Sequence, residues 1–154
     1  MGISPKMKAR LESIDRLVLD GYRVKKIYNA WPELATLSGV PKNITISNPA
    51  GFSWIAFFFP FAVYAQIKEW SYFYVAGFVS LGGSVLNKIV GWDPSMLLGL
   101  ALGLQYGIFF PYLRWIALQE NRTELAVGPS IAVGLLMSAM CTIPSIALDA
   151  LLGL

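Results

Sequence analysis

Side chains that carry out most enzyme chemistry are scarce in this sequence. It contains no histidine, which removes the usual general base and the most common metal ligand. The single cysteine, Cys141, lies in an apolar stretch, where its simplest role is that of a small buried side chain. The common phosphate-binding, zinc-protease and nucleophile-elbow motifs do not occur. We therefore expect no enzyme, and we predict no catalytic residue, no cofactor and no metal ion.

Two polar residues stand out within the apolar stretches of the chain. Gln105 lies near the middle of residues 94–113, where an amide needs a hydrogen-bond partner inside a helix bundle. We expect a bond between helices there, with a solute pathway as the alternative. Asp149 lies near the end of the last apolar stretch without a second ionisable residue beside it. An interfacial position for Asp149 is therefore favoured over a proton relay.

Small residues recur at helical spacing and predict close packing. Gly99, Gly103 and Gly107 follow one another every four residues, which gives a flat groove on one helix face. Two further stretches carry small residues at similar spacing: Ala76, Ser80 and Ser84, and Ser130, Gly134, Ser138 and Thr142. We expect these stripes to pack helices into a tight bundle or against another subunit.

The distribution of charge indicates which solvent surrounds these stretches. Hydrophobic residues make up 56% of the chain and charged residues 14%, against about 25% charged in an average soluble domain. Most Lys and Arg residues lie before residue 51, where acidic residues interrupt them and no nucleic-acid recognition motif appears. This pattern predicts an integral membrane protein whose basic end contacts lipid headgroups, and it argues against a nucleic-acid partner.

Residues 1–50 are expected to form a water-facing segment made of one helix and a linker. Residues 5–30 have the spacing of an amphipathic helix. Its apolar positions recur every three or four residues: Met7, Leu11, Ile14 and Val18. Such a helix either covers its own domain or a partner, or it lies on the membrane surface. Pro32 is expected to end or kink the helix, and residues 38–51 form a turn-rich linker.

The remainder, residues 51–154, is expected to be the membrane domain. It contains four apolar stretches, at residues 52–67, 70–90, 94–113 and 126–152. The first is shorter than the roughly 20 residues that cross a bilayer, and Pro60 removes a helical hydrogen bond from its middle. We therefore expect residues 52–67 to form a re-entrant or interfacial segment and the other three stretches to be transmembrane helices.

The basic residues between these stretches support the same topology. If residues 52–67 spanned the membrane, Lys68, Arg114 and Arg122 would lie on the side opposite the N-terminus. If they do not span it, only Lys88 lies there. The positive-inside rule favours the second arrangement, with the N-terminus in the cytoplasm and the C-terminus outside. The expected fold is an all-α integral membrane protein.

Aromatic residues cluster near the ends of the predicted spans. Trp and Tyr favour headgroup depth, so we expect them to anchor the chain at the interface, together with a neighbouring arginine. The candidate anchors are Trp54, Trp70, Tyr72, Tyr112, Arg114 and Trp115. A platform for a pigment or a quinone is the alternative reading of these aromatic rings.

Residues 52–61 read F-S-W-I-A-F-F-F-P-F and are followed by Tyr64 and Lys68. They resemble the opening of a small bacterial inner-membrane family of uncharacterised function, whose members share an F-x-W-x-A-F-F-F start. The resemblance is strongest over residues 52–70. The family usually carries a glycine near the position of Pro60, which this chain lacks. The resemblance implies a bacterial cytoplasmic membrane and no particular reaction.

Together these features predict a small accessory or scaffolding subunit of a larger membrane assembly. Its expected partners are membrane lipids and other transmembrane subunits, with a homo-oligomer as an alternative. A channel or small transporter lined by Gln105 and the Ser130–Thr142 stripe is the second hypothesis. The third is a regulator whose N-terminal helix senses anionic lipid.

Overall fold

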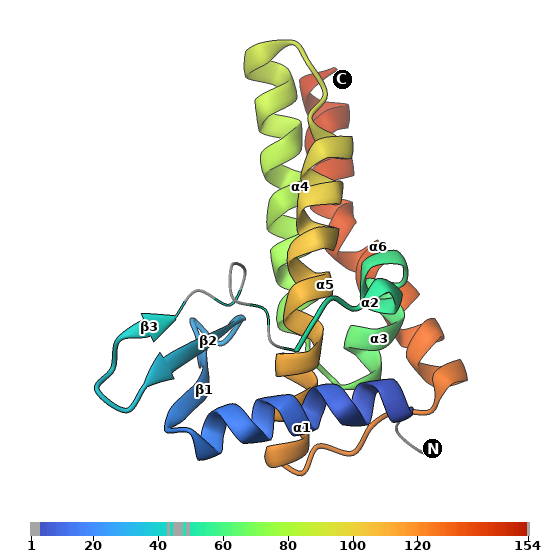
Figure 1. Ribbon diagram of the computed structural model, residues 1–154. Coiled ribbons are helices and arrows are strands. Elements are labelled where there is room, and N and C mark those ends of the chain that lie inside the picture. Colours follow the sequence, from blue (N-terminus) through green and yellow to red (C-terminus); the bar gives the residue numbers. More distant parts are fainter. Residues whose placement is uncertain (1–3, 43, 45–47, 49, 154) are drawn as a thin grey trace.

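The computed structural model describes residues 4–153 apart from 43, 45–47 and 49. This part of the chain is mostly helical and also contains a small sheet (Figure 1). In chain order the elements are α1 (Pro5–Leu19), β1 (Tyr22–Ile27), β2 (Trp31–Thr36), β3 (Pro41–Lys42), α2 (Trp54–Phe58), α3 (Pro60–Gln66), α4 (Ser71–Val90), α5 (Ser95–Gln119) and α6 (Val127–Leu152).

The N-terminal helix is shorter than the sequence pattern indicated. α1 begins at Pro5 with Ser4 as its N-cap, whose hydroxyl accepts a hydrogen bond from the Met7 amide at 3.3 Å. It ends at Leu19, because Gly21 adopts a φ of +88° and turns the chain into β1. The expected helix over residues 5–30 is therefore wrong beyond residue 19.

Residues 22–42 form a three-stranded antiparallel sheet in the order β1-β2-β3, so the prediction of an all-α fold is wrong. In β1, exposed Arg23 and Lys25 alternate with half-buried neighbours, which is the period of a strand rather than of a helix. Tyr28 and Asn29 make the turn to β2 with φ values of +50° and +56°. Pro32, the expected helix terminator, lies within β2, and the expected linker contributes β3.

The short aromatic stretch forms two short helices instead of one span. The break lies at Phe59, whose φ of −129° and ψ of 50° are not helical. Pro60 then begins α3, in the first-turn position where its missing N–H costs nothing. α2 packs against α5, and α3 packs against α6 (Figure 1).

Three helices, α4, α5 and α6, are long and apolar enough to cross a membrane. α4 and α6 match the predicted stretches 70–90 and 126–152 closely, whereas α5 continues past the predicted end at residue 113 to Gln119. α5 contains Pro111, which cannot donate a hydrogen bond to the carbonyl of Gly107. The amide of Ser53 donates to that carbonyl instead, at 2.8 Å.

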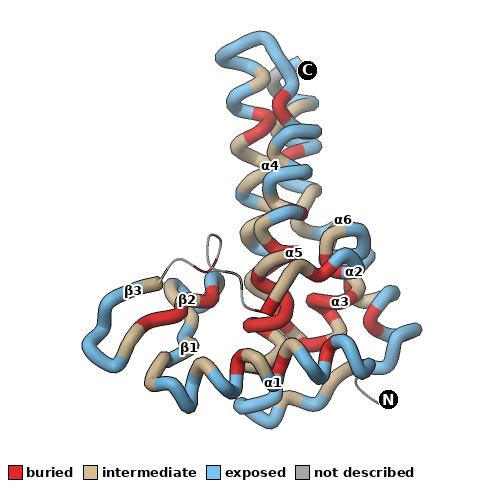
Figure 2. The backbone as a smooth tube through the Cα atoms, viewed as in Figure 1, coloured by how far each residue is buried: buried red, intermediate tan, exposed pale blue. Residues whose placement is uncertain are grey.

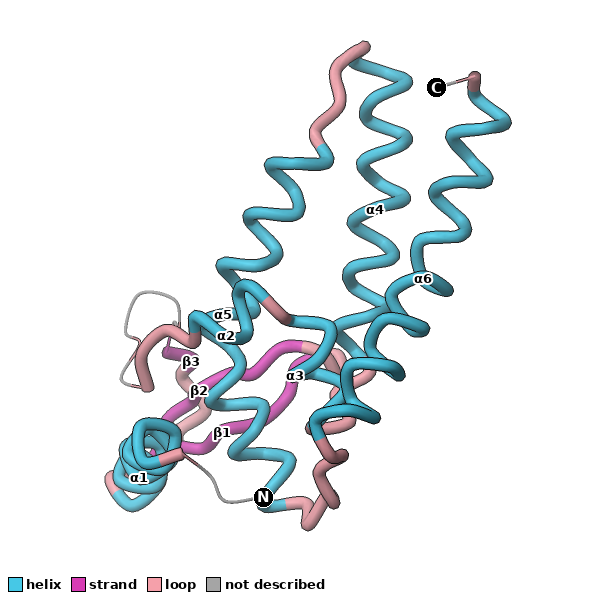
Figure 3. The backbone as a smooth tube through the Cα atoms, turned by 90° about the vertical axis from the view of Figure 1, so that its right-hand side faces the viewer, coloured by secondary structure: helices cyan, strands magenta, loops and turns pink. Residues whose placement is uncertain are grey.

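The core lies at one end of the three long helices, around the C-terminal half of α5. α1 crosses this end, the sheet lies on one side of it, and α2 and α3 lie on the other (Figures 1 and 2). Here α5 buries Tyr106, Phe110, Tyr112 and Leu113 almost completely. The opposite ends of the long helices expose most of their apolar side chains, and Figure 3 shows them as a loose group rather than a closed bundle.

Candidate functional site

The glycine stripe of α5 receives aromatic rings from the segment before α3. A Cβ atom placed on Gly107 would lie 2.5 Å from the ring of Phe52, and one on Gly103 would lie 3.3 Å from the ring of Phe57. Glycine at these positions therefore makes room for residues 52–57. Gly99 differs, because a Cβ there would meet nothing within 4 Å.

The stripe on α6 is used in the same way. A Cβ on Gly134 would lie 2.3 Å from the carbonyl oxygen of Phe61, so α3 packs directly against the α6 backbone. Ser130, one turn earlier, is buried, and its hydroxyl donates a hydrogen bond to the Val127 carbonyl within the same helix. At these positions the small residues accommodate the short helices rather than another long helix.

Farther along the helices, small residues from all three spans line a cleft of about 210 Å³. They are Ala76, Gly77 and Ser80 of α4, Gly99 of α5, and Ser138 and Thr142 of α6. The Thr142 hydroxyl donates to the Ser138 carbonyl at 3.1 Å, within α6. Ser84, one turn beyond Ser80, is buried and donates to the Ser80 carbonyl at 3.4 Å. In this cleft, members of the predicted stripes of α4, α5 and α6 line a common space.

The two intramembrane polar candidates lie apart from each other. Gln105 is half-buried on α5, and within the described residues its side chain makes no hydrogen bond to another residue. Asp149 is near the C-terminal end of α6, where its Oδ1 is shielded from solvent and has no partner among the described residues. The predicted bond between helices at Gln105 is not formed in this part of the chain.

The predicted interfacial anchors divide into two groups. Trp54 is exposed and Trp70 is half-buried, whereas Tyr72 and Tyr112 are buried in the core. Tyr72 and Tyr112 are therefore packing residues rather than surface anchors, because the N-terminal segment and α3 cover them. The remaining predicted anchors, Arg114 and Trp115, bind acidic side chains. The Arg114 guanidinium donates to both carboxylate oxygens of Glu124 at 2.8 Å, and the Trp115 indole donates to Asp15 at 2.7 Å.

A buried ionic cluster lies where α3 is joined to α4. The carboxylate of Glu69, only 3% exposed, pairs with Lys26 of β1 and with Arg122 at 3.2 Å. The Ser71 hydroxyl donates to the same carboxylate at 2.6 Å. The cluster therefore ties together the sheet, the start of α4 and the loop between α5 and α6. Buried charges of this kind require such partners, because an ion removed from water without one is costly.

Lys68 extends this cluster toward solvent. Its backbone has a φ of +54°, which turns the chain between α3 and α4, and its carbonyl accepts a hydrogen bond from Arg122 at 3.2 Å. The Lys68 ammonium donates to the Thr123 hydroxyl at 2.9 Å. Within the described chain, Lys68 thus has a neutral hydrogen-bond partner and no carboxylate partner.

A cavity of about 680 Å³ opens between this cluster and the tip of the β1–β2 hairpin. Its charged end contains Lys26, Lys68, Glu69 and Arg122. Its apolar end consists of side chains from the first turns of α4: Tyr74, Val75 and Phe78. Tyr28, Asn29 and Ala30 of the β1–β2 hairpin also line the cavity. The cavity is therefore charged at one end and apolar at the other.

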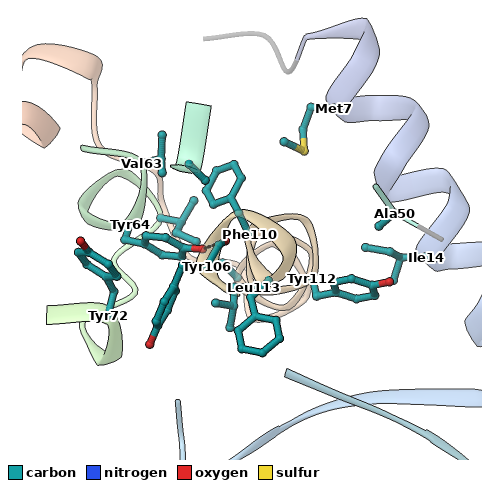
Figure 4. Close-up of a cluster of buried hydrophobic side chains, with 14 of the residues drawn as sticks. Met7, Ile14, Ala50, Val63, Tyr64, Tyr72, Tyr106, Phe110, Tyr112 and Leu113 are labelled. Carbon is teal, nitrogen blue, oxygen red and sulfur yellow. Dashed lines mark hydrogen bonds between the residues drawn. The ribbon is translucent and has the colours of Figure 1, made fainter. Parts of the chain in front are cut away.

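A cluster of buried aromatic side chains joins α3, α4 and α5 (Figure 4). Tyr64 of α3 stacks on Tyr72 of α4 with ring centroids 5.0 Å apart, and its hydroxyl donates to the Tyr106 carbonyl at 2.6 Å. Complete burial raises the pKa of Tyr64 well above its usual value, so it stays a neutral donor. Figure 4 shows Tyr112 on another side of α5, directed toward Ile14 of α1.

Sequence reasoning missed both the cluster and its cavity. Lys26 falls within the helix expected over residues 5–30, whereas the structure places it in β1, beside Glu69. A signal was nevertheless present, because the Lys68–Glu69 pair stands between two apolar stretches. A carboxylate so placed needs cations, and the remote Lys26 and Arg122 supply them.

Comparisons of the chain with protein families, with characterised proteins and with solved structures found no match. The resemblance over residues 52–70 stays a prediction, and the function has to be argued from the cleft and the cavity.

Proposed function

We propose that this protein is a multi-pass membrane protein that acts as a small accessory or scaffolding subunit of a larger membrane assembly. Three helices of sufficient length and apolarity support insertion. The charged N-terminal segment lies at one end of these helices (Figure 1). Lys68, just before α4, Arg114, in the last turns of α5, and Arg122, just after α5, belong to the same end. By the positive-inside rule this end faces the cytoplasm of a bacterial cell. The role is structural and involves no catalysis.

The observation that carries this proposal is the small-residue cleft shared by α4, α5 and α6. In the most apolar windows of α4 and α6, only 17% and 11% of the residues are buried, against 39% for α5. Small side chains along the cleft allow another backbone to approach closely, which is how transmembrane helices associate. We therefore place a helix of a partner subunit against the cleft, with Gly99 at the point of closest approach.

The two alternative functions receive less support from the geometry. A lipid-sensing N-terminal helix needs a free apolar face, but α1 buries Met7, Leu11 and Ile14 in the core of its own chain. A channel needs polar groups directed into a path. The hydroxyls of Ser84 and Thr142 are instead bonded to carbonyls of their own helices.

The test is the native mass of the protein extracted gently from its own membrane, with the co-purifying chains identified. We expect a larger assembly that contains other membrane subunits. Gly99→Leu should reduce co-purification, because the leucine side chain fills the cleft. Gly82→Leu is the matched control, since a Cβ on Gly82 also meets nothing within 4 Å but lies outside the cleft.

Both variants should retain the melting temperature of the unaltered protein, since neither added side chain starts in a crowded position. A stable, monomeric protein that co-purifies with nothing would contradict the proposal. If Gly82→Leu and Gly99→Leu lost partner subunits equally, the cleft would not be the contact site.

A further inference from the structure

We propose that the cavity beside Glu69 binds the headgroup of an anionic phospholipid, with the phosphate ester held by Lys26, Lys68 and Arg122. This inference rests on the membrane insertion proposed above and is independent of the partner subunit. It concerns a different end of the molecule from the small-residue cleft.

The charges that line the cavity leave an excess of positive charge. Three cations face one carboxylate, Glu69. A second carboxylate, that of Glu120, pairs with Arg122 from outside the cavity. Among the described residues, the Lys68 ammonium then has the Thr123 hydroxyl as its partner and no carboxylate. A cation beside a partly closed cavity favours an anion as its ligand, because an ionised acceptor makes the stronger hydrogen bonds.

The Glu69 cluster also leaves donors available to a ligand. The ammonium of Lys26 has three N–H donors, and its one bond among the described residues is to Glu69. Because Lys26 is only 9% exposed, its ammonium is held in place by the cluster rather than free to move in solvent. Lys26 and Arg122 therefore provide a fixed base for the site, and Lys68 provides the less constrained cation at its entrance.

The apolar end of the cavity selects a lipid over a free phosphate. Tyr74 and Phe78 are exposed on successive turns of α4 beyond the charged end. The rise of an α-helix places Phe78 about 10 Å along the axis from Ser71. A phospholipid has the same order of parts, a charged head followed by an apolar chain. Inorganic phosphate would use the charged end alone and leave this wall uncovered.

The hairpin tip carries a residue type that favours the headgroup region of a membrane. Tyr28 is 89% exposed and lines the cavity together with residues of the first turns of α4. An exposed tyrosine suits the interface between water and lipid, where its ring and its hydroxyl meet different surroundings. The volume of about 680 Å³ is within the range of small-molecule sites in proteins.

The experiment measures lipid binding to the full-length protein by native mass spectrometry from detergent micelles. Phosphatidylglycerol is titrated against phosphatidylcholine of the same chain length, and inorganic phosphate is added as a competitor. Lys68→Gln is the test variant, because it removes a charge but leaves the Glu69 cluster intact. Lys25→Gln is the matched control, since Lys25 lies next to Lys26 in the sequence and does not line the cavity.

We expect the protein to retain phosphatidylglycerol in preference to phosphatidylcholine. Lys68→Gln should weaken that binding about tenfold, and Lys25→Gln should leave it unchanged. Equal binding by the two variants, or no preference between the two lipids, would overturn the site. Displacement of the lipid by millimolar inorganic phosphate would overturn the lipid assignment and leave a phosphate site.

Different results would refute the proposed function. A protein that fractionates without membrane would refute insertion before any lipid is added. A membrane-inserted protein without partner subunits would refute the accessory role and leave the lipid titration valid.

Discussion

At the scale of single residues, Glu69 shows how charge specifies the arrangement of this chain. Its carboxylate is hardly reached by solvent and is shared by Lys26, Arg122 and Ser71. A buried ion pair adds little net stability, since removing both charges from water offsets their attraction. The ion pairs instead favour one arrangement of the chain, because a misplaced β1 or a misplaced loop after α5 would leave a buried charge without a partner.

The variant Glu69→Gln tests this interpretation. It keeps the size of the side chain but leaves Lys26 without a counter-charge. We expect the free energy of unfolding in detergent to fall by about 3–5 kcal/mol, the cost of breaking a buried pair. Glu33→Gln is the control, because Glu33 pairs with Lys25, which is 60% exposed, and a pair of that kind contributes at most about 1 kcal/mol. Similar losses in both variants would count against a special role for Glu69.

At the scale of elements, the length of the apolar stretches predicted the long helices that it determines by itself. It did not predict the elements whose bounds depend on contacts between residues far apart in the sequence. The bounds of α4 and α6 were predictable because a long apolar run with charged or turn residues at its ends has few other solutions. The end of α5 was not predictable, because a charged residue such as Arg114 normally marks the end of an apolar helix. Here Arg114 pairs with Glu124, and the helix continues past it. β1 was missed because the helical period of residues 5–19 was extended through Gly21.

The contact between α3 and α6 gives a prediction at this scale. Gly134→Ala places a methyl group where the Phe61 carbonyl lies, and a backbone cannot move aside as a side chain can. We expect a loss of about 1–3 kcal/mol in the free energy of unfolding, as for other overpacked sites. Gly99→Ala has open space and should be neutral or more stable by up to about 1 kcal/mol, because alanine favours the helix. Melting temperatures in detergent compare the two, and a Gly134→Ala protein as stable as Gly99→Ala would disprove the close contact.

At the scale of the whole molecule, the three long helices have a packed end and an open end. α1, the sheet and the two short helices surround the C-terminal half of α5, and the opposite half has no such cover (Figure 2). The candidate headgroup cavity belongs to the packed end. That cavity was unpredictable from the sequence, since its walls come from β1, from the α3–α4 junction and from the loop after α5.

The orientation of the molecule can be tested with single cysteines in a Cys141→Ser background. Lys25→Cys lies at the packed end, and Trp92→Cys lies in the exposed loop between α4 and α5 at the other end. We expect an impermeant maleimide to label Trp92→Cys in intact cells and to label Lys25→Cys only after the cells are opened, because the positive-inside rule favours the basic end in the cytoplasm. The reverse pattern would invert the topology.

The contacts that Phe52, Ser53 and Phe61 make with α5 and α6 can form only after those later helices have been synthesised. These residues leave the ribosome before the helices that receive them, since the groove around Gly107 and the flat face at Gly134 lie far downstream. Until α5 and α6 are made, the rings of Phe52 and Phe61 lack the glycine positions against which they pack in the finished protein. A nascent chain halted before residue 95 would therefore leave those two rings without their packing partners, in the state in which exposed apolar surface promotes misassembly.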